Sequence, residues 1–183
     1  MAKIAEQQAN EKGSTAEQEL EEILRGLKLE ARGDRVFMPH YEPVRYVGDK
    51  NEFPFYLSTY KTMTHAEGRG ANQPWLQEVF DLQVHMQWEP WLEINPQSAA
   101  TLKIKDGDLV WVESKIGKTK VKAKLFAGAK PDIVSMPFEY GHKRFGRWAE
   151  KRGVNPNEIL APEFDHLGGL CSFYSTRVKV YKA

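Results

Sequence analysis

The sequence contains a single cysteine, Cys171, in 183 residues. One cysteine excludes an internal disulfide, a CxxC zinc site and an iron–sulfur cluster ligated by cysteines of this chain alone. Long apolar runs are also absent, because none approaches the roughly 18 residues that a membrane-spanning helix needs. We therefore expect no direct membrane insertion, and any metal chemistry requires ligands from elsewhere.

Excess charge of one sign is missing as well. The chain has 26 basic and 25 acidic residues and a net charge of +1, so no global field attracts nucleic acid or an anionic membrane. Four lysines, at 118, 120, 122 and 124, alternate with other residues. This period of two predicts the solvent-facing side of a strand rather than a nucleic-acid surface, and we expect no nucleic-acid partner.

The N-terminal residues show no targeting signal, since residues 1–13 are polar and lack a secretory apolar core or a twin-arginine pair. The compartment stays open: the chain could be cytoplasmic, or exported with a partner that carries the signal. Hydrophobic residues make up 41% and charged residues 28%, which is typical of a globular domain. The length fits one domain with an appendage.

The appendage is predicted at the N-terminus. Residues 14–17, Ser-Thr-Ala-Glu, have the pattern of a capping box, and apolar residues follow at helical spacing at Leu20, Ile23, Leu24 and Leu27. This pattern predicts an amphipathic helix of about four turns. A lone helix cannot close a core, so we interpret residues 1–35 as a polar tail with a docking helix and residues 36–183 as the folded domain.

The rest of the chain is predicted to be mainly β with short helices. Strand patterns occupy residues 53–59, 91–94, 109–114, 118–125, 133–136 and 176–181. Asn95-Pro96 and Gln73-Pro74 each indicate the start of a helix. A long polar excursion, residues 138–174, separates the last two strands, and loops of that length in a compact domain are usually functional.

The order of these parts carries a resemblance. Residues 92–99 and 102–114 form a strand, an Asn-Pro helix start, an LKIKDGD turn and a hairpin strand, and this order resembles the molybdopterin-dinucleotide-binding domain of the dimethyl sulfoxide reductase family. Residues 57–61 with His65 and Asn72 are similar to the family's strand and cofactor loop, where an arginine commonly occupies the position of Lys61. Residues 165–169 resemble the segment before the last strand.

Two positions depart from the family pattern: His166 replaces the usual proline, and Tyr174 stands where many members have a lysine. The resemblance covers residues 51–182. It implies a six-stranded double-psi β-barrel, here preceded by an N-terminal helical arm.

The resemblance also implies the function. The domain would bind and cap a bis(molybdopterin guanine dinucleotide) cofactor with molybdenum or tungsten, shared with a larger catalytic region or subunit. That partner would hold the iron–sulfur cluster, and an iron–sulfur electron-transfer subunit would assemble with it. The chain would be part of a molybdopterin oxidoreductase and inactive in isolation. Residues 60–61 and 139–142 are similar to the tetrathionate, arsenate and polysulfide reductase branch, which implies anaerobic respiration on a sulfur or arsenic oxyanion.

The candidate binding residues follow from the cofactor's charge. Pyrophosphate groups bind to backbone N–H donors and fixed cations, and residues 59–69 offer threonine hydroxyls, two cations and Gly68. The candidates are Thr59, Tyr60, Lys61, Thr64, His65, Arg69, Asn72, Tyr140, His142, Asn155, Asn157 and Tyr174. No catalytic or metal-ligating residue is assigned, because the sequence shows neither a Ser-His-Asp set nor a glutamate pair.

Each candidate also has a plainer interpretation. Residues 59–72 could be a solvated connection, His65 a structural histidine, and residues 140–142 a structural aromatic loop. Asn155 and Asn157 could cap a helix or a turn. A rival function is a stand-alone double-psi barrel that serves as an interaction or adaptor module, which would need neither the polar loop nor the long excursion. An autonomous small enzyme has no motif in its favour.

Overall fold

The computed structural model describes residues 15–84, 86–144, 146–166 and 168–183. The chain divides into two compact units. Unit 1 consists of the described residues up to Pro43 together with Phe164–Ser172, and unit 2 consists of Val44–Glu163 together with Phe173–Ala183. Among the described residues, no helix combines the length and the apolarity that crossing a membrane requires.

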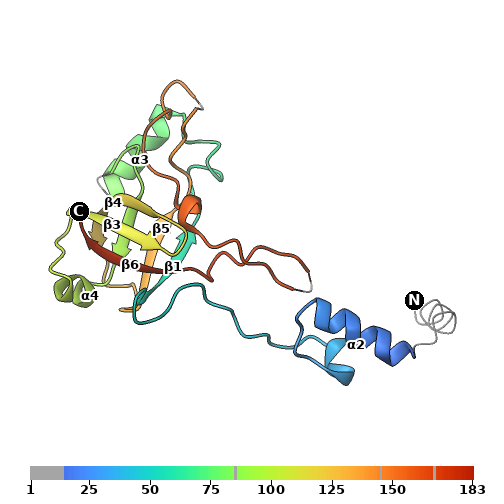
Figure 1. The fold of residues 1–183 in the computed structure, drawn as a ribbon. Coiled ribbons are helices and arrows are strands. Elements are labelled where there is room, and N and C mark those ends of the chain that lie inside the picture. The colour runs from blue at the N-terminus through green and yellow to red at the C-terminus, as the bar shows by residue number, and fades with distance from the viewer. Residues whose placement is uncertain (1–14, 85, 145, 167) are drawn as a thin grey trace. The chain divides into compact units, whose positions relative to one another are not determined.

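Unit 2 is built on a closed six-stranded barrel (Figure 1). Its strands are β1 (Phe55–Tyr60), β2 (Trp91–Ile94), β3 (Leu109–Ser114), β4 (Lys118–Leu125), β5 (Ile133–Pro137) and β6 (Arg177–Lys182). They are joined in the order β1-β5-β2-β4-β3-β6, and β6 pairs with β1 to close the barrel. The pairs β1–β5 and β2–β4 are parallel, and the others are antiparallel. This architecture confirms the predicted mainly-β barrel with short helices.

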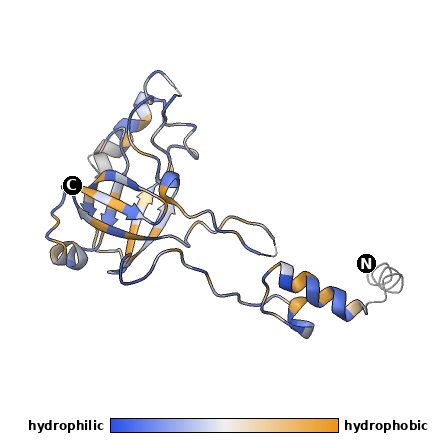
Figure 2. Cartoon of the chain, viewed as in Figure 1, coloured by the Kyte–Doolittle hydropathy of each residue, from blue (hydrophilic) through white to orange (hydrophobic). Residues whose placement is uncertain are grey.

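The barrel core follows from the period of two in the strands. Residues of β1 are alternately buried and half-buried, and hydrophobic and hydrophilic positions also alternate along the strands in Figure 2. Leu92, Ile94, Val134 and Met136 are fully buried. Burial of each such aliphatic side chain contributes about 1.5 to 3 kcal/mol, so this core stabilises the barrel.

The lysine side of β4 faces solvent, as predicted. Val121 and Ala123 point into the core, whereas Lys118, Lys120 and Lys122 are exposed. The ammonium groups of Lys118 and Lys120 lie 4.8 and 4.6 Å from the centre of the Trp111 ring. Two of the four cations therefore sit against an indole on the neighbouring strand, a contact that accounts for them without any external ligand.

The short helices of unit 2 are α3 (Pro74–Val84), α4 (Pro96–Thr101) and η2 (Pro156–Ile159). At the predicted Asn-Pro start of α4, the side chain of Asn95 accepts a hydrogen bond of 2.8 Å from the backbone N–H of Gln97. This bond satisfies one of the orphan donors at the helix end. The element η2 lies within the long excursion and is tied to the barrel, because the Ser114 hydroxyl donates to the carbonyl of Ile159 over 2.6 Å.

Unit 1 contains α2 (Ala16–Gly26) and η1 (Gly33–Val36). The predicted capping box is present one residue later than expected: Thr15 is the N-cap, and its backbone and side chain exchange hydrogen bonds with Gln18. The predicted cap, Ser14, lies outside the described residues. The helix has 11 residues rather than about four turns, because Lys28 adopts a positive φ of 55° that ends it.

Candidate functional site

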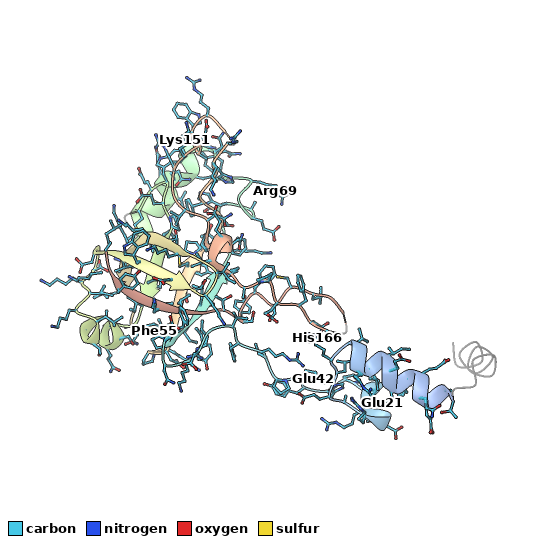
Figure 3. All side chains as sticks on the ribbon, viewed as in Figure 1. Glu21, Glu42, Phe55, Arg69, Lys151 and His166 are labelled. Atoms are coloured by element: carbon cyan, nitrogen blue, oxygen red, sulfur yellow. The ribbon has the colours of Figure 1, made fainter. Side chains whose placement is uncertain are left out.

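The carboxyl ends of β1 and β5 lie at the same edge of the barrel, because the two strands are parallel neighbours. The chain leaves β1 into residues 61–72 and leaves β5 into the start of the excursion. The backbone N–H of Phe138 donates to the carbonyl of Tyr60 over 3.3 Å, which joins the two exits. In Figure 3, Phe55 marks the start of β1 and Arg69 lies on the loop beyond its end. Candidate residues from distant parts of the sequence therefore meet here.

Glu139 organises the loop that follows β1. Its carboxylate is buried, with 2% of the residue exposed. One oxygen accepts hydrogen bonds from the backbone N–H (2.7 Å) and the hydroxyl of Thr62, and the other accepts from the N–H of Glu67 over 3.1 Å. Sequence reasoning did not select Glu139 as a site residue. The available signal was a lone carboxylate two residues after the end of the apolar strand β5.

His65 is fully buried beneath this loop. The Oε1 atom of Gln77 accepts from the backbone N–H of Trp88 over 2.9 Å, so its amide nitrogen faces His65 and donates to Nε2 over 2.8 Å. The proton of the neutral ring is then on Nδ1, which lies 2.9 Å from the hydroxyl of Thr64. These contacts favour the structural interpretation of His65, which shapes the loop through both ring nitrogens.

The burial of His65 makes a pH-dependent contribution to stability. Burial lowers the pKa of His65 below its ordinary value of 6.5. As the pH falls below that value, the unfolded chain takes up the histidine proton before the folded chain does, and the free energy of unfolding decreases. We expect His65→Gln to show a smaller decrease between about pH 7 and pH 5 in urea unfolding. The other histidines are common to both proteins, so parallel pH profiles would contradict this prediction.

Two hydroxyls at this edge are buried without a hydrogen-bond partner among the described residues: Thr59 Oγ1 and Tyr140 Oη. Thr59 is 2% exposed and Tyr140 is 4% exposed. The Tyr140 ring lies 5.2 Å from the His65 ring, centre to centre. Burial raises the pKa of Tyr140, so its phenol keeps its proton and can donate. A buried hydroxyl without a partner costs about 1 to 3 kcal/mol, which suits both groups to a polar ligand.

Three other candidates have partners or are exposed. The phenol of Tyr60 donates to the carboxylate of Glu93 over 2.7 Å, and burial with this bond raises its pKa. Lys61 forms an exposed ion pair with Glu67 and lowers the pKa of that carboxyl. Arg69 is exposed, and its Nε donates to a backbone carbonyl of its own loop. The two cations are therefore accessible from solvent.

Asn72 joins the loop to the excursion. Its side-chain oxygen accepts hydrogen bonds from the backbone N–H groups of Trp148 (2.7 Å) and Ala149 (3.1 Å). A Cβ atom on Gly146 would lie 2.4 Å from the same oxygen, so the turn approaches Asn72 at a distance that only glycine permits. Asn72 thus has a positioning role that the sequence did not reveal.

The remaining candidates lie in the excursion. The His142 ring faces the loop, since a Cβ atom on Gly68 would lie 3.7 Å from its Cε1. Asn155 caps η2, where its side chain accepts from the N–H of Asn157 over 3.0 Å. Asn157 and Tyr174 are exposed. The structure therefore brings six candidates together at the loop (Thr59, Thr64, His65, Asn72, Tyr140 and His142) and leaves Lys61, Arg69, Asn157 and Tyr174 at the surface.

Comparisons with known proteins identify the family of this chain. Residues 55–177 match the family described as "Molydopterin dinucleotide binding domain". The chain is 36% identical over 171 residues to the molybdopterin-containing subunit of the arsenate respiratory reductase of Shewanella sp. (strain ANA-3), covering 89% of this chain and 20% of that protein. It is 35% identical to the corresponding subunit of Chrysiogenes arsenatis, covering 90% of this chain and 21% of that protein.

More distant matches extend the set. The molybdopterin-containing subunit of a Salmonella typhimurium thiosulfate reductase is 31% identical and covers 64% of this chain and 15% of that protein. Acetylene hydratase from Pelobacter acetylenicus has the same fold, with a TM-score of 0.58 and 16% identity, over 87% of this chain and 22% of that one. The chain spans about one fifth of the length of its first relatives. Because a family match covers most of the barrel, the chain belongs to the family of molybdopterin dinucleotide-binding domains.

Proposed function

We propose that this chain binds and caps a bis(molybdopterin guanine dinucleotide) cofactor as the C-terminal domain or small subunit of an oxidoreductase that reduces an arsenic or sulfur oxyanion. Two relatives that match nine tenths of the chain are subunits of arsenate respiratory reductases, and a third belongs to a thiosulfate reductase. In this proposal the larger catalytic region supplies the metal ligand and the iron–sulfur cluster, and an iron–sulfur subunit delivers electrons. The chain alone is inactive.

The observation that carries the proposal is the pair of buried hydroxyls of Thr59 and Tyr140, which have no partner among the described residues. When bound, the cofactor supplies the redox chemistry of its metal, and the protein's task is to hold and orient it. Its pterin and phosphate groups offer the hydrogen-bond acceptors and donors that these hydroxyls lack. Lys61 and Arg69 add exposed cations on the adjoining loop, which favours an anionic ligand.

Removal of either hydroxyl tests the proposal. Thr59→Val and Tyr140→Phe keep the shape of the side chain, so each should reduce cofactor retention in the assembled enzyme by about tenfold, the effect of roughly 1.4 kcal/mol. The cofactor-free chain should be unchanged or more stable, because the hydroxyl it loses is unsatisfied. Metal and guanine nucleotide released per assembled enzyme measure the first effect, and urea unfolding of the chain measures the second.

Thr176 provides the matched control. It is as buried as Thr59, at 1% exposure, but its hydroxyl oxygen accepts a hydrogen bond of 2.8 Å from the N–H of Ala161. Thr176→Val should therefore destabilise the cofactor-free chain by about 1 to 3 kcal/mol. If Thr59→Val behaved like Thr176→Val and kept its full cofactor content, the assignment of Thr59 to cofactor binding would be wrong.

A further inference from the structure

Unit 1 exposes most of its large apolar side chains. Its buried apolar residues are Leu24, Leu29 and Ala31. The exposed ones are Ile23, Leu27, Phe37, Met38 and Tyr41, here called the arm residues, together with Phe164 and Leu170. Phe37 is 73% exposed and Tyr41 is 78% exposed. A part of this size cannot close a core of its own, and clustered exposed apolar residues mark interaction sites.

Local hydrogen bonds nevertheless hold residues 15–43, here called the arm, in a defined conformation. The guanidinium of Arg32 donates to the carbonyls of Leu29 (2.6 Å) and Ala31 (2.8 Å), and it forms an ion pair of 3.0 Å with Glu21 on α2; Glu21 is labelled in Figure 3. Further along, one ring nitrogen of His40 lies 2.8 Å from the carbonyl of Met38. Polar contacts therefore shape the segment, while its apolar side chains point outward.

The exposed face of α2 differs from the predicted stripe. The sequence grouped Leu24 with Ile23 and Leu27 on one docking face. Leu24 is buried within unit 1 at 4% exposure, whereas Ile23 is 58% exposed and Leu27 is 37% exposed. Leu24 is thus used for internal packing, and Ile23 and Leu27 remain for an external surface. Figure 2 shows hydrophobic positions interleaved with hydrophilic ones along α2.

The relatives indicate what covers this surface. Their alignments include 89% and 90% of the chain. Residues 44–183 make up only about three quarters of its 183 residues, so both alignments include part of the arm. The arm therefore has a counterpart in both relatives. This chain matches 20% and 21% of the length of those subunits. In those subunits, four fifths of the protein is available to pack against it.

We propose that the arm residues dock on the larger region of a molybdopterin-containing subunit and so hold the barrel against the region with which it shares the cofactor. This inference rests on the proposed function. The occupant of the apolar surface is the catalytic region itself, rather than a membrane or a second copy of this chain. Burial of five large apolar side chains in that contact supplies the stabilisation that unit 1 lacks by itself.

Trypsin cleavage after Arg35, an exposed residue of η1, tests docking. In the assembled enzyme, cleavage should be about tenfold slower or more than in the chain alone, because docking removes the accessible conformation. The double variant Phe37→Asp/Met38→Asp should restore the fast rate in the enzyme. The control Glu30→Gln/Asp34→Asn changes exposed polar residues of the same segment and should leave the enzyme protected. Thermal unfolding of each chain checks the barrel.

Metal and guanine nucleotide content, measured on the same samples, separates the two proposals. A fully loaded enzyme that is cut after Arg35 as fast as the chain alone overturns docking but leaves the proposed function intact. An enzyme without cofactor that still protects Arg35 supports docking and contradicts the proposed function. If the chain alone dimerises in sedimentation, the double variant abolishes the dimer and the enzyme is unprotected, the occupant is a second copy and the proposal is wrong.

Discussion

Gly141→Ala is expected to destabilise the chain by about 4 kcal/mol or more, which is exceptional for one methyl group. Gly141 has a φ of +83°, and an added Cβ would lie 2.3 Å from the backbone nitrogen of Asn155 and 2.4 Å from the carbonyl carbon of Val154. Backbone atoms cannot rotate away as a side chain can. Residue 141 and residues 154–155 of the excursion would have to move apart, and Tyr140 would move with residue 141.

Gly107→Ala separates the steric effect from the conformational one. Gly107 has a similar φ of +80°, but an added Cβ would meet nothing within 4 Å. The Gly107→Ala variant should lose only about 1 to 2 kcal/mol of unfolding free energy, the cost of a left-handed backbone conformation for alanine. Urea unfolding of the two variants beside the wild type measures the difference. Equal losses in both would mean that the approach of residue 141 to residues 154–155 is less close than the structure shows.

Glu139→Ala should cause the second-largest loss, about 3 to 5 kcal/mol. Each of the three hydrogen bonds to this carboxylate contributes roughly 1.5 to 3 kcal/mol, and their contributions do not add fully. The variant leaves the N–H groups of Thr62 and Glu67 without their acceptor. We therefore expect a lower unfolding midpoint and faster trypsin cleavage at Lys61 and Arg69, which lie on the released loop.

Two further variants separate the effect of the buried carboxylate from that of surface charge on the loop. Glu139→Gln keeps the volume of the side chain and one acceptor oxygen, so its loss should lie between that of wild type and that of Glu139→Ala. Glu67→Ala removes a carboxylate from the same loop, but that side chain is exposed and forms an ion pair with Lys61. Exposed ion pairs contribute little, so Glu67→Ala should leave the cleavage rate close to wild type. A matching acceleration in Glu67→Ala would show that the loop's surface charge, rather than the buried carboxylate, orders it.

The loop after β1 also distinguishes cofactor binding from the rival interpretation as an interaction module. Such a module has no need of a fastened polar loop, yet the loop after β1 is held by Glu139 at one side and by Asn72 at the other. Its buried hydroxyls at Thr59 and Tyr140 have no hydrogen-bond partner among the described residues, a cost that a bound polar ligand would offset. Membership of the family, the fastened loop and the two buried hydroxyls favour cofactor binding over the interaction module.

The sequence pattern alone determined a mainly-β domain and the places where several of its strands and helices begin and end, whereas the barrel was implied by the resemblance to a family. Strands β2, β3 and β4 were predicted with their observed bounds, because a period of two and a tight turn are properties of adjacent residues. The helix start at Asn95-Pro96 was equally local, since an N-cap bonds to a residue two or three positions away. The outward lysines of β4 followed from the same periodicity. The candidate loop after β1 was found through its resemblance to a family, whereas local chemistry left it open to a plainer interpretation.

Only the tertiary structure decided how that loop works. The bonds from Thr62 to Glu139 span 77 residues, and those from Trp148 to Asn72 span 76. No periodicity or cap relates residues so far apart, because their contact depends on β1 and β5 pairing in parallel. The lack of a hydrogen-bond partner among the described residues for the hydroxyls of Thr59 and Tyr140 also became visible only in the folded chain. Likewise, the sequence predicted that α2 is amphipathic. Packing within unit 1 decided that Leu24 is buried and Ile23 is exposed.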